Sequence, residues 1–418
     1  MTPPRWQVPF VRPDLPAFAT VAPDIEAAFA SGMLTKGPAL ERLEAAAAAV
    51  LGVRHVIGMS SCTVALALLL RALEDVAARS VTGCQAAQAC PLPPTARRAA
   101  AGRREVILPS FNFLAAPAAV EWAGLEPVFV EVDPETFAID PAAAAAAVTP
   151  RTAAIMACHT FGCPCDEEAL VAVAERAGVP LVVDAAPGLG TLAHGRQVGA
   201  AGLAQVFSLS PTKLVVAGEG GLVATNCDCL AELLRVTREY GNDGHYGCQV
   251  PGLNGRLPEI SAIVARASLA RLPEVTARRR AVAAAYMESL ADVPGIGFQR
   301  IPGWAESNWK DFSISVDSAR AGIDRDGLRA RLAAAGIDTR AYYDPPCHRM
   351  DAFARFLPAD RDLPVTDHLS ASLLALPMGS HVPPEVARRV AAAIRSAVPG
   401  ATGVAGTSRV PASPGVAS

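Results

Sequence analysis

A single lysine follows the pattern of a buried strand and directly precedes a glycine-rich turn. Lys213 ends the run that starts at Phe207, and the turn Gly218 to Gly221 comes soon after it. Burial in apolar surroundings lowers the pKa of a lysine, and a partly neutral amine can form a Schiff base with an aldehyde. A lysine that extends its charged head from a loop into solvent is the alternative. The neighbouring segments must decide between the two.

A carboxylate stands at the end of another apolar run. Asp184 follows Pro180 to Val183, which places it at the edge where open α/β sheets bind ligands. A buried carboxylate without a partner is unfavourable, and a protonated pyridine nitrogen would be a suitable partner. That ion pair would keep the ring an electron sink. Capping of the following turn is the alternative role for Asp184.

The segment Met59 to Leu66 predicts the end of a strand and the start of a helix on small hydroxylated residues. Ser61, Cys62 and Thr63 stand at this junction. Free backbone N–H groups, the positive helix end and the hydroxyl groups could hold a phosphate dianion. An ordinary helix N-cap uses the same residue types, so both interpretations remain open.

The elements that must position these residues alternate from Val53 onward. Short β-branched runs separated by Ala- and Leu-rich helical patterns predict βαβ units and a largely parallel sheet with helices on its faces. The expected strands are Val53 to Gly58, Glu105 to Leu108, Pro127 to Val132, Ala153 to Cys158, Pro180 to Val183, Val206 to Leu209 and Gly221 to Thr225. The expected helices are Thr63 to Ala78, Leu114 to Trp122, Pro141 to Ala147 and Glu167 to Arg176.

The pattern changes after a long helical stretch from Leu257 to about Leu290, which Pro273 interrupts. The strands expected beyond it, Gly297 to Arg300 and Asp311 to Val316, and the helices Asp326 to Ala335 and Pro384 to Ala397 predict a smaller C-terminal α+β domain. We expect an N-terminal arm (1–25), a large domain (26–270), a small domain (271–399) and a disordered tail (400–418). Residues 78–103 would form an inserted loop, either a lid or a solvated insertion.

Composition restricts the possible partners. A net charge of −3 and a pI near 6.2 make nucleic acid an unexpected partner. No apolar run is long enough to cross a bilayer and no signal peptide stands out, so we expect a cytoplasmic protein. The two Cys-x-Cys pairs, at 163/165 and 227/229, lack the spacing and the histidines of a zinc site, so we expect no metal.

In order, these segments resemble the DegT/DnrJ/EryC1/StrS sugar aminotransferases, a branch of the fold-type-I enzymes that depend on pyridoxal phosphate. The resemblance extends over nearly the whole chain. It rests on the segments Thr35 to Pro38 with Glu44, Ser61 to Thr63, Pro109 to Phe113, His159 to Gly162, Asp184 to Ala186, Ser208 to Lys213, Gly218 to Gly221, Gly252 to Arg256, and Thr339 to Tyr343 with His348.

The resemblance implies an α/β fold of type I, with a mostly parallel seven-stranded sheet between helices and a smaller C-terminal α+β domain. It implies that Lys213 holds pyridoxal 5′-phosphate as a Schiff base, that Asp184 pairs with the pyridine nitrogen and that Phe113 stacks on the ring. Ser61, Cys62, Thr63 and Ser208 would hold the phosphate. Asn254 would reach it from the neighbouring subunit, so the resemblance implies a homodimer with shared active sites.

The implied reaction moves an amino group from glutamate or glutamine to the keto group of a nucleotide-linked keto-deoxy sugar. The Lys213 amine would act as general base and acid. A ketocyclitol or another unusual ketone of a natural-product pathway is the alternative acceptor. Positions on the substrate side, each of which could equally be a surface residue, are Lys36, His159, Arg340, Tyr343 and His348.

Three departures limit what the resemblance carries over. Pro187 stands where glutamine, a donor to the ring hydroxyl, is common, and Cys62 stands where glycine is common. The 78–103 insertion could reshape the entrance to the site. A related sugar dehydratase would have histidine in place of Lys213, which argues against that rival. A non-enzymatic binding protein of the same fold is the second rival. The acceptor, the aminated carbon and the donor are open at this level.

Overall fold

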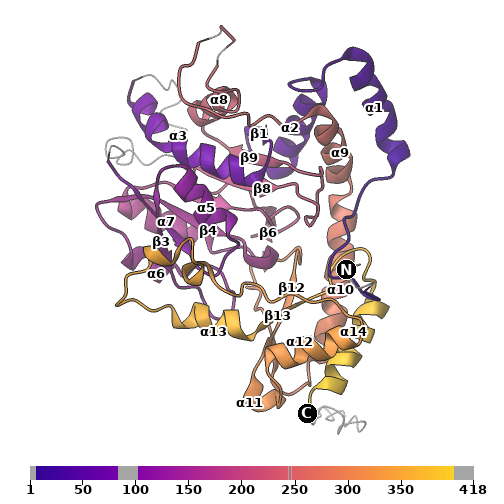
Figure 1. Ribbon diagram of the computed structural model, residues 1–418. Helices are drawn as coiled ribbons and strands as arrows, with labels where there is room; N and C mark the ends of the chain where they lie inside the picture. Colours follow the sequence, from indigo (N-terminus) through magenta and orange to yellow (C-terminus); the bar gives the residue numbers. More distant parts are fainter. Residues whose placement is uncertain (1–5, 83–101, 243, 246, 400–418) are drawn as a thin grey trace, which may run out of the picture.

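The computed structural model describes residues 6–82, 102–242, 244–245 and 247–399 (Figure 1). The tail expected at 400–418 and most of the expected insertion, residues 83–101, lie outside this described part. The predicted start of the insertion at residue 78 is wrong, because helix α3 continues to Thr82. Residues 78–82 contain neither glycine nor proline, and Gly83 is the first helix breaker after them.

The seven predicted strands form one sheet in the order β1-β9-β8-β5-β4-β2-β3. All neighbouring pairs are parallel except those of β9, which runs antiparallel to both β1 and β8. The expectation of a mostly parallel seven-stranded sheet is therefore confirmed. The strands are β1 (His55–Met59), β2 (Glu105–Pro109), β3 (Glu126–Val130), β4 (Thr152–Cys158), β5 (Leu181–Asp184), β8 (Ala204–Ser208) and β9 (Gly221–Thr225).

Helices cover both faces of this sheet, because alternate strand residues point to opposite sides. In β4, for example, Ile155 packs with one helical layer and Met156 with the other. The first layer comprises α2 (Pro38–Leu51), α6 (Pro141–Ala146), α7 (Glu167–Ala177) and α9 (Glu259–Ala270). The second comprises α3 (Cys62–Thr82), α5 (Ala115–Trp122) and α8 (Asp228–Thr237).

A second core lies around the smaller sheet β10-β12-β13. Figure 1 shows α10 descending from α9 to α14 beside this sheet. The strand β13 was missed, since its four apolar residues directly follow a helix without a turn signal. The elements are α10 (Leu272–Leu290), β10 (Ile296–Phe298), β12 (Phe312–Val316), α11 (Ser318–Ala321), α12 (Arg325–Ala334), η2 (Cys347–Arg349), η3 (Ala354–Phe356), α13 (Pro364–Ser372), β13 (Leu373–Leu376) and α14 (Pro384–Ala397).

One expected domain limit falls between two helices, and the other falls inside a helix. The limit between residues 270 and 271 falls between α9 and α10, whereas the limit at 25/26 falls inside α1 (Phe18–Ser31). Within the expected arm, Val8 pairs with Ile337 of the small domain. A short sheet of β11 (Ala305–Glu306), β6 (Leu192–Ala193) and β7 (Arg196–Gln197) joins the two parts of the chain, and η1 (Thr160–Gly162) follows β4.

A buried carboxylate fastens the start of α2 to α9. Glu259 is 1% exposed, and its two oxygens accept hydrogen bonds from the N–H groups of Gly37, Ala39 and Leu40 at 2.8 to 3.0 Å. A Cβ atom at Gly37 would lie 2.7 Å from Glu259 Oε2, so the close approach requires glycine. Glu259 therefore satisfies N–H groups that the first turn of a helix leaves without partners.

We expect Glu259→Ala to destabilise the protein by about 3 kcal/mol, because three buried donors lose a charged acceptor. The thermal midpoint should fall clearly below that of the wild type. Glu232→Ala, which removes an exposed carboxylate on α8, is the matched control and should leave the midpoint unchanged. Equal midpoints for the two variants would contradict this account of Glu259.

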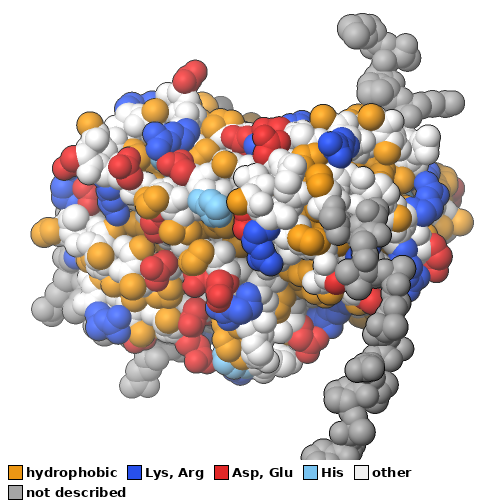
Figure 2. All heavy atoms as spheres, turned by 90° about the horizontal axis from the view of Figure 1, so that it is seen from below, with side chains coloured by type: hydrophobic (Ala, Val, Ile, Leu, Met, Phe, Trp, Pro, Cys, Tyr) orange, Lys and Arg blue, Asp and Glu red, His pale blue; other side chains and the backbone are white. Residues whose placement is uncertain are grey.

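Across the described residues, no helix combines the length and the apolar character that crossing a membrane requires. On the face of the molecule that Figure 2 shows, Lys and Arg side chains lie interspersed with Asp and Glu side chains. No disulfide joins two of the described cysteines.

Candidate active site

A cavity of about 450 Å³ lies at the carboxyl ends of the parallel strands. These strands share one direction, so the loops that follow them meet at one edge of the sheet, where α/β proteins bind ligands. Loops of the small domain close the other side. The cavity is lined by Ser61, Cys62, Thr63, Leu66, Asn112, Phe113, Ala115, Cys158, Phe161, Asp184, Ala186, Pro187, Ser208, Ser210, Pro211, Thr212, Lys213, Glu219, Lys310, Asp311, Tyr342 and Tyr343.

Lys213 lies in the loop after β8 and is partly buried in the cavity wall. Its backbone N–H donates to Ser210 O at 3.0 Å, which fixes a tight turn. Its amine makes no hydrogen bond or ion pair with any described residue, although its charge acts on Asp184. The structure thus presents an uncommitted amine to the cavity.

Asp184 is the last residue of β5 and is 4% exposed. Burial raises the pKa of its carboxyl, while the N–H of Ala186, which donates to Oδ1 at 3.1 Å, and the charge of Lys213 lower it. The turn contact expected from capping is therefore present. Among the described residues no cation forms an ion pair with this carboxylate, so a cationic ligand in the cavity would relieve its unfavourable burial.

The N-terminus of α3 faces the same cavity. Ser61 Oγ accepts from Val64 N–H at 3.1 Å, so Ser61 is an N-cap while it also lines the cavity. The N–H groups of Cys62 and Thr63 have no acceptor within the described chain. A Cβ atom at Gly221 would lie 2.7 Å from Cys62 N, so β9 must begin with glycine for the backbones to approach this closely. The helix end can accept an anion.

Further lining residues come from segments that the sequence reasoning did not single out as chemical. Lys310 and Asp311 precede β12 and form a buried ion pair in the cavity wall. Tyr343, expected on the substrate side, does line the cavity, beside Tyr342. Its ring stacks on Phe161 with centroids 5.6 Å apart. The one signal for Lys310 in the sequence is the scarcity of lysine, which occurs at only three positions.

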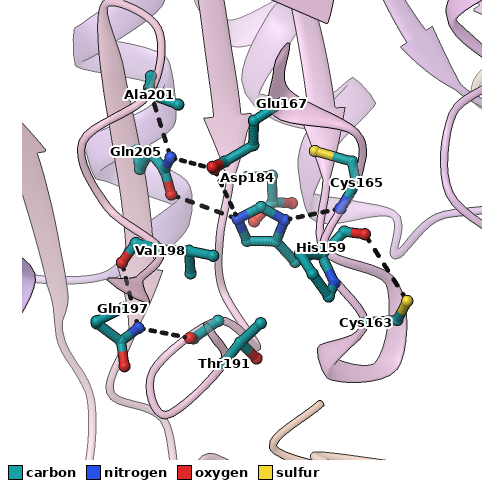
Figure 3. A network of polar contacts seen from close by, with 12 residues as sticks. His159, Cys163, Cys165, Glu167, Asp184, Thr191, Gln197, Val198, Ala201 and Gln205 are labelled. Atoms are coloured by element: carbon teal, nitrogen blue, oxygen red, sulfur yellow. Dashed lines mark hydrogen bonds and ion pairs between the residues drawn. The ribbon is translucent and has the colours of Figure 1, made fainter. Parts of the chain in front are cut away.

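The structure does not bring His159 to the cavity. His159 is not among the residues that line the cavity, and its ring lies in the network of polar contacts shown in Figure 3. Nδ1 accepts from Cys165 N–H at 3.2 Å, so Nε2 carries the proton and faces Gln205 Oε1 at 3.3 Å. Burial lowers the pKa of this imidazole, which favours its neutral form. The expectation that His159 contacts the substrate is therefore corrected. Its backbone N–H donates to Asp184 O at 3.3 Å and supports the backbone there.

His348 and Arg340 are also turned away from the cavity. His348 is 2% exposed, with Nδ1 2.6 Å from Ser110 Oγ and Nε2 3.1 Å from Asp367 Oδ1, so it anchors the loop that carries Tyr342 and Tyr343. Arg340 donates to Asp338 and lies over the ring of Phe10, 5.2 Å from its centroid. Neither supports a direct substrate contact within this chain.

Lys36 and Asn254 lie outside the cavity of their own chain but close to one another. Lys36 Nζ is 3.6 Å from Glu239 Oε2, and the backbone of Asn254 pairs with that of Glu239. Both residues are exposed. We call their surroundings the Lys36/Asn254 surface, which includes the exposed apolar side chains of Met33, Leu34, Tyr240, Leu253 and Ile260.

Pro187 lies in the cavity wall and contributes no polar side-chain atom to it. Its carbonyl accepts from Asn308 Nδ2 at 2.5 Å, and the same amide donates to Leu189 O at 2.7 Å. This loop is therefore tied to the segment that carries Lys310.

A family profile, related sequences and solved structures all place this chain among similar proteins. The profile of the DegT/DnrJ/EryC1/StrS aminotransferase family matches residues 19–395. The erythromycin biosynthesis sensory transduction protein EryC1 of Saccharopolyspora erythraea is 39% identical over 70% of this chain and 78% of its own. The dTDP-3-amino-3,4,6-trideoxy-alpha-D-glucose transaminase of Streptomyces venezuelae is 35% identical over 93% and 96%. The crystal structure of DesI with its TDP-sugar product superposes with a TM-score of 0.83 at 35% identity, covering 96% and 95%.

Proposed function

The chain belongs to the DegT/DnrJ/EryC1/StrS aminotransferase family, and from this membership and the cavity around Lys213 we propose the reaction that it catalyses. It moves an amino group from glutamate or glutamine to the keto group of a nucleotide-linked keto-deoxy sugar. The nucleotide-sugar acceptor is supported by the names of the Streptomyces transaminase and of DesI with its TDP-sugar product.

One observation carries the chemistry: an uncommitted amine, a buried carboxylate and a helix N-terminus line the same cavity. Lys213, Asp184 and Ser61 come from three strand ends that are far apart in the sequence. An amine reacts with an aldehyde, a buried carboxylate stabilises a cation, and a helix N-terminus binds a phosphate. These groups match the aldehyde, the ring nitrogen and the phosphate of pyridoxal phosphate.

Pyridoxal phosphate is the coenzyme of this family, and the residues of the cavity fit it. The carboxylate of Asp184 lacks a cationic partner that the protonated ring nitrogen would supply. The free N–H groups of Cys62 and Thr63, with the hydroxyls of Ser61, Thr63 and Ser208, would hold the phosphate. Phe113 is 53% exposed at the cavity and has an open ring face for stacking.

When bound, the coenzyme supplies a carbonyl carbon that accepts an amino group and a protonated ring that withdraws electrons from it. Lys213 would hold that carbon through its amine and, once the amino donor has taken its place, would accept the proton from the donor Cα. The same amine would return the proton as general acid. The carboxylate of Asp184 would favour a protonated ring nitrogen. Phe161, Tyr343 and Leu66 line the cavity and, with the coenzyme bound, would exclude water from its surroundings.

We propose that a second copy of the chain covers the Lys36/Asn254 surface. Asn254 and Lys36 are too far from their own cavity to line it, and they are surrounded by exposed apolar side chains of a kind that subunit contacts bury. In a two-fold dimer each copy would present this surface to the cavity of the other. Asn254 would then reach the phosphate and Lys36 the acceptor side of the partner's site. The absence of disulfides among the described cysteines supports a reducing compartment, and we propose the cytoplasm.

A ketocyclitol or another unusual ketone of a natural-product pathway is the alternative acceptor. The apolar Pro187 in the cavity wall is a departure from the family pattern that suits an unusual acceptor. The likeness to a protein of erythromycin biosynthesis favours a natural-product pathway over general metabolism. The chemistry at Lys213 would be the same.

Transfer of isotope tests the proposed reaction. The protein loaded with pyridoxal phosphate is incubated with ¹⁵N-glutamate and one candidate acceptor. The acceptors are a dTDP-linked 4-keto-6-deoxyhexose, its 3-keto isomer and a ketocyclitol. The masses of the products are measured by mass spectrometry. We expect ¹⁵N in one nucleotide sugar and none with Lys213→Ala. Label only in the cyclitol would select the alternative. Conversion of glutamate to 2-oxoglutarate without label in any acceptor would contradict both acceptor classes.

A further inference from the structure

Lysine is rare in this chain, and its distribution is uneven. Of the 37 Lys and Arg residues only three are lysines, at positions 36, 213 and 310. Two of the three, Lys213 and Lys310, line the same cavity. Arginine supplies nearly all the other positive charge, so a lysine in the cavity wall is not a consequence of overall composition. Lysine differs from arginine in carrying a compact charge on a slim stem.

Lys310 is held in one position by its surroundings. Its Nζ lies 2.8 and 2.9 Å from the two oxygens of Asp311, and the two residues are 8% and 6% exposed. The backbone beneath them is fixed, because Asn308 Oδ1 accepts from Lys310 N–H at 2.8 Å and Arg279 donates to Lys310 O at 2.9 Å. Lys310 therefore stands in the cavity wall on a fixed backbone, with its ammonium group held against Asp311.

A contribution to the stability of the fold does not explain the ion pair between Lys310 and Asp311. Removing two charges from water is unfavourable, and a buried pair rarely stabilises a fold more than apolar side chains of similar volume would. Lys310 and Asp311 are neighbours in sequence, so their contact joins no distant elements. An ammonium group has three N–H donors, and Asp311 occupies two of them. One donor of a fixed cation remains for a ligand.

We propose that Lys310 binds the carboxylate of the amino donor in the cavity. This inference rests on the proposed aminotransferase function and names how its donor is recognised. Lys213 and Lys310 are the cations among the described residues that line the cavity, and the reaction engages the amine of Lys213. A donor carboxylate must also enter beside the acidic groups Asp184, Glu219 and Asp311, so it needs a compensating cation.

The same geometry favours a carboxylate over a nucleoside diphosphate as the anion that Lys310 binds. Only a small part of Lys310 is exposed, and Asp311 lies against it, so a singly charged carboxylate can approach the free donor. A nucleoside diphosphate carries more negative charge and would meet stronger repulsion from Asp311. Both ligands contain an anion that lysine can bind, so the experiment must separate them.

The test measures binding of glutarate, an unreactive dicarboxylate, to the coenzyme-loaded protein by calorimetry. Lys310→Gln with Asp311→Asn removes both charges, keeps hydrogen-bonding groups in place and leaves the net charge unchanged. We expect this double variant to bind glutarate about 10- to 100-fold more weakly, since a charge-assisted hydrogen bond is lost. Glu219→Gln, which removes a charge elsewhere in the cavity wall, is the matched control and should bind glutarate at least as tightly as the wild type.

The pH dependence of glutarate binding gives a second readout. Burial lowers the pKa of Lys310 to about 8, with Lys213 and Arg279 lowering it and Asp311 raising it. Tyr342, whose pKa burial raises to about 12, stays neutral in this range. The carboxylate binds the protonated amine, so affinity should be highest well below pH 8 and should fall as the pH rises through the pKa of Lys310. The double variant should lack this fall.

Unchanged glutarate affinity in the double variant would overturn the proposal. So would a variant that keeps glutarate affinity but binds dTDP more weakly, because Lys310 would then recognise the nucleotide. Failure of the proposed function would be distinct, since the wild-type protein itself would not take up pyridoxal phosphate. A borohydride-reducible absorption band in both proteins shows that each is folded and loaded before glutarate is added.

Discussion

Replacing Lys213 with alanine should lower kcat for amino transfer by about 10³- to 10⁴-fold or more, because general base and covalent roles are both lost. The residue lines the cavity, makes no ion pair with the described chain and follows the strand end that the fold places at the ligand-binding edge. No other lysine is available to replace it, since Lys310 is held by Asp311. Turnover is measured as 2-oxoglutarate formed from glutamate in the presence of an acceptor.

Two controls accompany the Lys213→Ala variant. Its thermal midpoint should match that of the wild type, because the side chain makes no hydrogen bond or ion pair within the described residues. Arg42→Ala removes an exposed positive charge on α2 and should leave kcat unchanged. Added methylamine should restore part of the activity of Lys213→Ala by supplying a free base. Turnover of Lys213→Ala at the wild-type rate would contradict the role of Lys213 in the reaction.

Asp184→Asn should have the second largest effect, a decrease in kcat of roughly 10²- to 10³-fold, as expected when one member of a buried charge pair is neutralised. The amide oxygen can still accept from Ala186 N–H, so the turn should persist. What is lost is the negative charge that would keep the ring nitrogen of the coenzyme protonated. Affinity for pyridoxal phosphate should also fall, because the ion pair contributes to binding.

The effect of Asp184→Asn is measured as kcat together with the dissociation constant of the coenzyme. Asp351→Asn, at an exposed carboxylate, provides the matched control and should change neither quantity. If Asp184 acted only as a turn cap, Asp184→Asn would retain wild-type kcat, since asparagine is an equally good cap. That result would remove Asp184 from the proposed site.

The large sheet was predictable because its signal is local. Short β-branched runs that alternate with helical periods predicted the strands from His55 to Thr225, and the structure shows all seven in one sheet. The direction of β9 was not predictable, since only tertiary packing makes this strand antiparallel. Strands of two residues, such as β6, are too short to leave a pattern in the sequence.

The parts of the site that lie at strand ends could be predicted for the same reason. Lys213, Asp184 and Ser61 follow recognisable strands, and the shared direction of parallel strands brings them together. Lys310 could not be placed, because the approach of the small domain to the sheet is a long-range contact. The orientation of His159 was also hidden, since its partner Gln205 is 46 residues away.

The most direct test of the whole account is the absorption spectrum of the purified protein supplied with pyridoxal phosphate, before and after borohydride. We expect a band of the bound coenzyme that borohydride removes, with the reduced adduct found on Lys213 by peptide mass mapping and absent from Lys213→Ala. A wild-type protein that stays colourless and unmodified under excess pyridoxal phosphate would contradict the central claim, and the fold would then serve binding alone.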